Sequence, residues 1–302
     1  MKCRRCREPA VIEVRRHNAG FCADCFLHHC RGQVAKAVDE HRMIAPGERV
    51  LVAVSGGKDS LALWDMLLDL GYDVDGLYLG LGIGAYSGSS GAYARAFADR
   101  RGARLVEIDL PADLGFDIPN GARAARRVPC SACGLSKRHL FNQAAVEGGY
   151  DVVATGHNLD DEAAVLLGNV LRWNVEYLGR QRPALPAGNG FARKVKPLVR
   201  LGERETAAYC VLRGIDYIVE ECPMAEGNRH LGYKESLNAI EERSPGAKAA
   251  FYFEFLDKAA DLFQPAAEAE RAGLNACAKC GAATTAEVCA FCNLRARATA
   301  VR

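Results

Sequence analysis

The chain has 302 residues, 49% of them hydrophobic and 25% charged, with a formal net charge of +2. No apolar run approaches the roughly 20 residues that span a bilayer, and the polar, cysteine-bearing N-terminus is not a secretory signal. These features exclude a membrane-spanning or secreted protein. We expect a cytoplasmic globular protein with enough chain for about two domains.

The first 43 residues predict a zinc module. Two Cys-x-x-Cys pairs stand fifteen residues apart, a spacing typical of a four-thiolate zinc site; they are Cys3, Cys6, Cys22 and Cys25. Residues 10–15 predict a short strand beneath the site, and residues 26–43 a helix leading into the main domain.

The stretch from Val50 to Ser60 predicts an anion-binding loop. Val50 to Val54 are apolar and mostly β-branched, as in a buried strand of a parallel sheet. Residues 60–70 have helical spacing and end before Gly71, a C′ cap. The intervening loop places free backbone N–H groups and a helix N-terminus at one point, where an anion binds. Its residues are Ser55, Gly56, Gly57, Lys58, Asp59 and Ser60, and their spacing is not that of a Walker A loop.

Strands and helices alternate through the middle of the chain, which predicts an α/β fold with a doubly wound parallel sheet. Ligands of such sheets bind beyond the carboxyl ends of the strands. The predicted strands are 74–79, 104–108, 151–155 and 215–219, and the predicted helices are 92–101, 129–147 and 203–213. The glycine-rich residues 80–91 predict a loop near the site.

Two segments are basic. Residues 121–140 hold five Arg or Lys and no acid, and residues 172–204 hold eight against Glu176 and Glu203. This segregation suits a polyanion larger than a nucleotide, although a solvated face is the usual role of such a run. We expect residues 174–201 to form a surface insertion that faces the large substrate.

Three cysteines outside the zinc pairs fall where the fold brings them to the same sheet edge: Cys130, Cys133 and Cys222. Lys137 follows Cys133 by four residues and projects from the same helix face. Three thiolates on a 4Fe-4S cluster leave one iron open. A three-cysteine zinc site, or a persulfide with a disulfide partner, is also compatible with the pattern.

Acidic residues follow the predicted strand 151–155. Asp160, Asp161 and Glu162 fall in the first turn of the next helix, where its dipole favours carboxylates. There they would face a nucleotide and hold Mg²⁺ or orient its phosphates.

The C-terminal part predicts helices over 232–263, a linker over 265–272 and a second zinc ribbon. Its ligands are Cys277, Cys280, Cys289 and Cys292. Cys210 lies in a helical pattern and is predicted to be in the core.

The order of these motifs resembles the TtcA/TtuA family of PP-loop ATP pyrophosphatases, the tRNA 2-thiouridine synthetases. The resemblance rests on both flanking zinc sets and on the segments SGGKDS, PCSAC, TGHNLDDEA and ECP. It implies a PP-loop catalytic domain at 33–264 between an N-terminal zinc finger at 1–32 and a C-terminal one at 273–302.

The resemblance also implies roles for single residues. Ser55 to Ser60 would hold the ATP phosphates, with Ala53, Leu79 and Gly156 near the nucleotide. Lys137 and Asp161 would be catalytic. The three cysteines would ligate a 4Fe-4S cluster, beside two Zn²⁺ and a Mg²⁺ ion.

The implied reaction is the adenylation of a uridine C2 carbonyl by ATP, with release of pyrophosphate, followed by sulfur transfer to give 2-thiouridine, most simply at the T-loop ribothymidine of tRNA. Implied partners are tRNA, a ubiquitin-like thiocarboxylated sulfur carrier and a second copy of the chain. Alternatives are thiolation of a wobble uridine or a cytidine, a non-thiolating PP-loop ligase of the GMP-synthetase type, and a zinc-ribbon RNA-binding protein.

Overall fold

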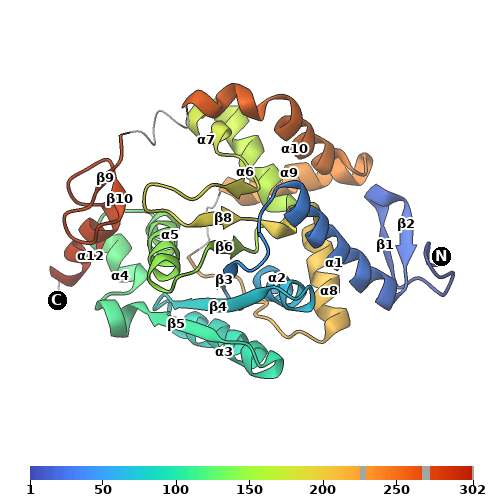
Figure 1. The fold of residues 1–302 in the computed structure, drawn as a ribbon, viewed down its shortest axis with the longest axis horizontal. Helices are drawn as coiled ribbons and strands as arrows, with labels where there is room; N and C mark the ends of the chain where they lie inside the picture. Colours follow the sequence, from blue (N-terminus) through green and yellow to red (C-terminus); the bar gives the residue numbers. More distant parts are fainter. Residues whose placement is uncertain (225–228, 267–272, 301–302) are drawn as a thin grey trace.

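A six-stranded sheet with the order β5-β4-β3-β6-β8-β7 forms the centre of the molecule (Figure 1). The computed structural model describes residues 1–224, 229–266 and 273–300. Neighbouring strands are parallel except for β7, which pairs antiparallel with β8 at the edge. The strands are β3 (Arg49–Val54), β4 (Asp73–Gly80), β5 (Leu105–Asp109), β6 (Val152–Thr155), β7 (Ala184–Leu185) and β8 (Arg193–Val195).

Strand β3 divides two cores, because successive side chains of a strand point to opposite faces. Val50, Val52 and Val54 belong to a core that includes helices α1, α2 and α8. Leu51 belongs to the other core, which includes α4, α5 and α12. The predicted α/β fold is confirmed, with the correction that one edge strand is antiparallel.

The helices before the sheet's last strands are α1 (Ala23–Glu40), α2 (Lys58–Asp69), α3 (Gly84–Arg101), α4 (Ile118–Ala124), α5 (Pro129–Glu147), α6 (Leu159–Arg172) and α7 (Val175–Gly179). The helices that follow β8 in the chain are α8 (Glu203–Arg213), α9 (Arg229–Arg243), α10 (Ala247–Lys258) and α12 (Ala290–Ala300). Short 3₁₀ or π turns are η1 (Arg15–His17), η2 (Leu110–Leu114), η3 (Pro197–Arg200) and η4 (Ala260–Phe263).

The prediction of a loop over residues 80–91 is wrong for its larger part. Helix α3 already begins at Gly84, despite the low helix propensity of glycine. Tertiary contacts hold its first turns, since the Tyr78 hydroxyl donates to the carbonyl of Ser87 at 2.5 Å and lies 2.7 Å from Ser90 Oγ. A side chain at Gly91 would press on the Tyr78 ring, 3.0 Å away, so the small residue allows this packing.

Two predictions about the end of the sheet are also wrong. Residues 215–219 form no strand; instead the Ile218 N–H donates to the carbonyl of Gly56 at 2.9 Å. The segment 174–201 is not purely a surface insertion, because it supplies β7, β8 and the fully buried Val195 and Leu198. A three-residue strand rich in basic side chains carries too little of a period-two pattern to be recognised.

The terminal modules lie at opposite ends of the molecule's long axis (Figure 1). The N-terminal one contains the hairpin β1 (Ile12–Val14) and β2 (Ala19–Phe21), and the C-terminal one β9 (Asn275–Ala276) and β10 (Ala283–Thr284). The predicted boundary at residue 32 falls inside α1, and most of the predicted linker 265–272 lies outside the described residues. Within the described ranges, no helix is long and apolar enough to cross a membrane.

Candidate nucleotide and metal site

The loop from Ser55 to Ser60 is shaped as an anion site. Gly56 has φ +73°, and a Cβ there would lie 2.1 Å from the carbonyl oxygen of Ser90. Helix α2 begins at Lys58 after Gly57, and no side chain caps it, so its first N–H groups face the loop. Ser60 Oγ accepts from the N–H of Ser55 at 3.1 Å and fixes the turn. The arrangement offers backbone donors and a helix N-terminus to a phosphate.

The carboxyl end of β6 lies directly against this loop. A Cβ on Gly156 would approach the backbone of Asp59 and Ser60 to 2.9 Å, so glycine is required for the close approach. The structure therefore brings Gly156 to the predicted phosphate loop. Ala53 and Leu79 lie on the neighbouring strands β3 and β4, where Leu79 is 4% exposed and belongs to a core cluster.

A chain of alternating charges runs from the loop to helix α6. Lys58 Nζ lies 3.1 Å from Asp59 Oδ2 and 2.7 Å from Glu203 Oε1. Glu203 Oε2 lies 3.2 Å from Lys234 Nζ, which in turn lies 2.6 Å from Asp161 Oδ1. Sequence reasoning missed Glu203 and Lys234 as site residues, because helices α8 and α9 carry them from distant parts of the chain.

Burial and neighbouring charge act in opposite directions on these groups. Burial lowers the pKa of Lys58, but the carboxylates of Asp59 and Glu203 outweigh it and raise the pKa above its ordinary value. The same opposition, with Asp161 and Glu203 prevailing, raises the pKa of Lys234. Burial raises the pKa of Asp59. Both lysines are therefore charged at neutral pH, with Asp59, Asp161 and Glu203 as their partners.

Two polar side chains hold Asp59 in place. Asn158 Nδ2 donates to Asp59 Oδ1 at 3.1 Å, and the Thr206 hydroxyl donates to the same oxygen. Asn158 also caps helix α6 in a reciprocal capping box with Asp161. Asp161 Oδ2 is thus occupied by the Asn158 N–H, while Oδ1 contacts Lys234.

Lys137, the other predicted catalytic residue, lies on α5 and is partly buried. Its charge lowers the pKa values of Cys133 and His157, in each case a smaller effect than that of burial. Among the described residues, Asp161 has an ion pair with Lys234 and none with Lys137. The structure therefore places Lys137 near the cysteines and Asp161 at the end of the row of ion pairs that starts at the phosphate loop.

Cys130, Cys133 and Cys222 lie around one corner of the second core. Cys133 and Cys222 are partly buried beside the apolar cluster that Tyr86 also contacts. Burial raises the pKa of Cys133, and the neighbouring Cys222 and Cys130 raise it further. Cys130 donates from Sγ to the carbonyl of Met224 at 3.0 Å, which ties the start of α5 to the Cys222 segment.

These three thiols are spread more widely than the thiols of the two four-cysteine sets. Thiolates around tetrahedral zinc stand about 3.8 Å apart, given Zn–S bonds of about 2.3 Å. In the part of the chain that the structure describes, metal-competent groups within 4.8 Å are the two four-cysteine sets, and Cys130, Cys133 and Cys222 form no third one. Three thiols converging on one partly open corner, near cationic Lys137, fit the larger 4Fe-4S cluster.

Helix α3 connects the thiol corner to the phosphate loop. Its Ser90 touches Gly56, and its Tyr86 lies close enough to Cys222 and Cys133 for their charges to raise the Tyr86 pKa, after the larger effect of burial. The predicted phosphate loop and the predicted cluster ligands Cys133 and Cys222 therefore lie near the same face of α3, at residues one helical turn apart.

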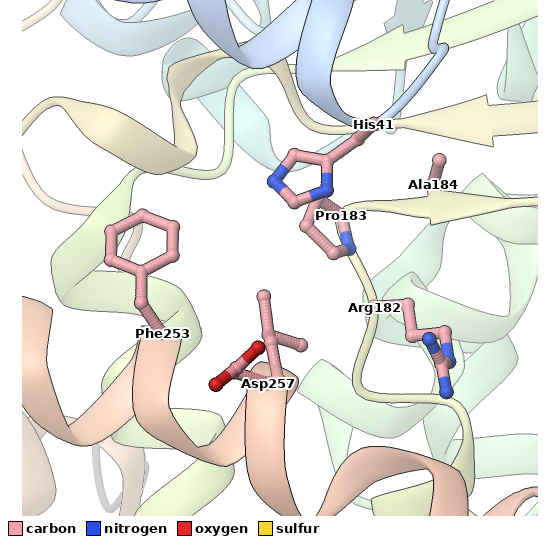
Figure 2. A pocket seen from close by; sticks show the side chains of 7 residues that line it. His41, Arg182, Pro183, Ala184, Phe253 and Asp257 are labelled. Atoms are coloured by element: carbon pink, nitrogen blue, oxygen red, sulfur yellow. The ribbon is translucent and has the colours of Figure 1, made fainter.

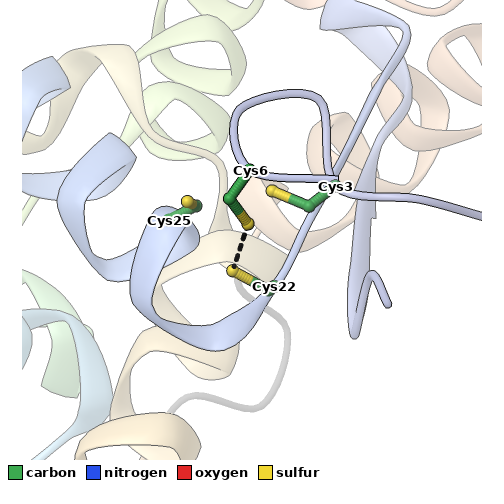
Figure 3. A group of neighbouring side chains, drawn as sticks. All are labelled: Cys3, Cys6, Cys22 and Cys25. Carbon is green, nitrogen blue, oxygen red and sulfur yellow. Dashed lines mark hydrogen bonds between the residues drawn. The ribbon is translucent and has the colours of Figure 1, made fainter. Parts of the chain in front are cut away.

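The N-terminal thiols gather from the first loop and the start of α1, as Figure 3 shows. All four Sγ atoms lie within 4.8 Å of one another, and Cys6 Sγ lies 3.5 Å from Cys22 Sγ. Backbone N–H groups around Cys3 lower its pKa to about 6, led by that of Cys6, although burial opposes them. The four residues fit tetrahedral zinc; they are Cys3, Cys6, Cys22 and Cys25.

The C-terminal thiols form the second such set, within the same 4.8 Å limit: Cys277, Cys280, Cys289 and Cys292. The N–H groups of Cys289 and Lys279 donate to Cys277 Sγ at 3.2 and 3.4 Å. Such N–H···S bonds stabilise a thiolate and orient it toward a metal. Cys210, by contrast, is fully buried in the core, as predicted.

A cavity of about 370 Å³ lies beside edge strand β7 (Figure 2). None of the residues predicted to bind nucleotide, cluster or zinc lines it. Its walls are side chains from the end of α1, from β7 and from α10: His41, Arg182, Pro183, Ala184, Phe253, Leu256 and Asp257.

The basic segments differ in how their charges are compensated. In the segment 172–204, four cations pair with carboxylates of the fold; they are Arg182, Arg193, Lys196 and Arg200. In the other segment, Arg123, Arg126 and Arg127 are exposed immediately before the cysteines of α5. The polyanion surface predicted from both segments is therefore more accessible around α4 and the start of α5.

Comparison with known proteins identifies the family of the chain. Residues 2–27 match the N-terminal LIM domain of 2-thiouridine synthetase TtuA. Over 97% of its length the chain is 50% identical to a tRNA-5-methyluridine(54) 2-sulfurtransferase of Thermus thermophilus and covers 91% of that protein. The chain belongs to the tRNA-5-methyluridine(54) 2-sulfurtransferase family.

Two further known proteins also match this chain over nearly its whole length. The tRNA-5-methyluridine(54) 2-sulfurtransferase of Pyrococcus horikoshii is 41% identical over 97% of the chain and 93% of its own length. The U34-tRNA thiolase NcsA of Methanococcus maripaludis, solved with its [4Fe-4S] cluster, superposes with a TM-score of 0.79 at 23% identity. That superposition covers 97% of this chain and 95% of the thiolase, so the two share a fold throughout.

Proposed function

We propose that this protein is an ATP-dependent tRNA 2-sulfurtransferase that converts 5-methyluridine at position 54 to its 2-thio form. The family relationship supports the substrate and the reaction. The observation that carries the proposal is that α3 contacts the phosphate loop through Ser90 and lies beside Cys133 and Cys222 through Tyr86, one helical turn away. A PP-loop ligase without sulfur chemistry gives Cys130, Cys133 and Cys222 no role.

Each step in the activation of the uridine by ATP has candidate residues in this chain. The uridine C2 oxygen attacks the α-phosphorus of ATP, the bond from that phosphorus to the oxygen bridging to the β-phosphate breaks, and pyrophosphate leaves with this oxygen. The loop Ser55 to Ser60 would hold the phosphates through backbone N–H groups and Lys58. Lys137 would neutralise negative charge that develops on the α-phosphate, and Asp161 would hold Mg²⁺. When bound, a 4Fe-4S cluster on three cysteines supplies an iron with an open position for a sulfur atom.

The tRNA would approach over α4 and the start of α5. Exposed Arg123, Arg126 and Arg127 stand beside Cys130 there, and phosphate contacts dominate nucleic-acid affinity. The C2 carbonyl of a paired or stacked base is inaccessible, so the nucleotide must leave its stack to react. A ubiquitin-like thiocarboxylated protein as sulfur donor, and a homodimer, belong to the same proposal by family resemblance.

The decisive experiment is anaerobic purification with iron, sulfide and zinc quantified, repeated on Cys222→Ala. We expect about four irons and about two zincs in the wild type, and loss of iron with retention of zinc in the variant. Cys210→Ala is the matched control, because Cys210 is a fully buried thiol that belongs to the other core cluster, and this variant should keep the iron.

Activity is read by mass spectrometry of nucleosides from tRNA incubated with ATP and sulfide. The proposal predicts a 2-thio product at position 54 that disappears in Cys222→Ala. Zinc without iron under strict anaerobiosis would refute the cluster. Product on tRNA whose position 54 is substituted would refute the assigned position.

A further inference from the structure

Lys234 of helix α9 reaches the nucleotide site from outside the PP-loop. Its Nζ lies 2.6 Å from Asp161 and 3.2 Å from Glu203, and its side chain is 21% exposed. Lys58 of the loop is 22% exposed and shares Glu203 with it. One carboxylate thus bridges two shielded ammonium groups.

The Glu203 carboxylate accepts hydrogen bonds from the two lysines in the way that a phosphate group would. Glu203 Oε1 accepts from Lys58 at 2.7 Å, and Oε2 accepts from Lys234. A phosphate presents two or three oxygens to surrounding donors in the same way. Ammonium groups this far shielded from water need a negative partner, and a phosphate would serve both of them.

Glu203 is also the most exposed of the three carboxylates that pair with these two lysines. Its side chain is 41% exposed, against 23% for Asp59 and 24% for Asp161. Asp59 is held by Asn158 and Thr206, and Asp161 by the capping box of α6. Glu203 lies in the first turn of α8, and its carboxylate contacts the two lysines.

We propose that Lys234 is a second phosphate-binding cation of the nucleotide site, and that Glu203 takes the place of a phosphate until nucleotide displaces it. This inference rests on ATP being the substrate, as proposed above. The competing interpretation is structural: Lys234 merely fastens α9 to α6 through Asp161.

The test measures binding of the α,β-methylene analogue of ATP with Mg²⁺ by titration calorimetry, on the full-length protein without tRNA. For Lys234→Met we expect affinity for the analogue to fall about tenfold, the loss of one charge-assisted hydrogen bond to phosphate. Affinity for adenosine, which has no phosphate, should be unchanged. Lys234→Arg keeps the charge and should restore most of the binding.

Lys248→Met is the matched control. Lys248 pairs with Asp160, the neighbour of Asp161. Its substitution therefore removes a comparable ion pair one residue away from that of Lys234. It should leave analogue affinity within about twofold of the wild type, since among the described residues Lys248 bonds to Asp160, Asn238 and Glu241 and to no residue of the loop. Melting temperatures of all variants establish that they are folded.

Glu203→Gln separates the two interpretations by the sign of its effect. Removing a charge that competes with phosphate should strengthen analogue binding several-fold, whereas removing a structural support should weaken it. Unchanged binding in Lys234→Met, or unchanged or weaker binding in Glu203→Gln, would overturn the inference. If the wild type binds the analogue no better than adenosine, the proposed use of ATP fails instead.

Discussion

At the scale of single residues, Gly56 decides whether the phosphate loop can form. Its φ of +73° belongs to the left-handed region, and a Cβ would meet the Ser90 carbonyl oxygen at 2.1 Å. Because that contact is with backbone, α3 itself would have to shift.

Gly56→Ala should therefore destabilise the protein by about 3 kcal/mol, from backbone strain and the clash together. It should also abolish binding of the ATP analogue. Gly47→Ala is the control, since Gly47 has φ +81° with nothing within 4 Å of its Cβ and incurs only the strain. Equal losses in the two variants, measured by urea unfolding, would show that the Ser90 contact is unimportant.

The residues that could be predicted from the sequence are those in short contiguous motifs. The phosphate loop and both zinc sets depend on spacing within a few residues, and the structure gathers each of them. Glu203 and Lys234 could not be predicted, because their role arises from packing of α8 and α9 against the loop. The helix that begins at Gly84 was missed since its support comes from Tyr78, a tertiary contact that overrides propensity.

At the scale of elements, helix α8 joins the N-terminal module to the nucleotide site. Its Glu205 accepts the N–H of Gly202 at 2.8 Å, lies 2.7 Å from Arg16, and lies 3.7 Å from His29 of α1. The same first turn presents Glu203 and Thr206 to the phosphate loop. A shift of the N-terminal module would therefore move the start of α8.

Glu205→Gln should lower stability by about 3 kcal/mol at pH 7, because it leaves Arg16 buried without a charged partner. Burial raises the pKa of Glu205, but His29 and Arg16 outweigh it and hold the pKa below 4.5. A lowered folded-state pKa gives stability that is complete above the unfolded value of about 4.5 and is lost as the pH falls through the folded value.

The difference in unfolding free energy between wild type and Glu205→Gln should accordingly shrink below about pH 4.5. Denaturant titrations from pH 7 to about pH 2.5 measure it, with Glu13→Gln, on an exposed face of β1, as the control. A difference that stays constant with pH would mean that Glu205 contributes through its shape and not its charge.

At the scale of the whole molecule, the N-terminal zinc module shares the main core. Cys3, Phe21 and Phe26 are buried in the same cluster as Val50 and Val52 of the central strand. The C-terminal module packs similarly, with Phe291 stacked 4.1 Å from the His139 ring of α5. Neither module is merely tethered to the sheet.

Removing zinc from the N-terminal set, by Cys25→Ser, should therefore lower the melting midpoint of the entire chain instead of melting a separate unit. Structural zinc contributes folding free energy directly. Circular dichroism of the helices, together with a zinc assay, measures both quantities. A variant that lacks one zinc but retains the wild-type midpoint would contradict the shared core as the source of stability.

The two zinc modules lie at opposite ends of the long axis, with the sheet and its loop between them (Figure 1). A ligand that touches both must be at least as long as the enzyme itself. A nucleotide is far too small to reach both modules, whereas an elongated macromolecule such as tRNA is large enough. A substrate that binds both modules is therefore selected by its length before its reactive base reaches the cysteines.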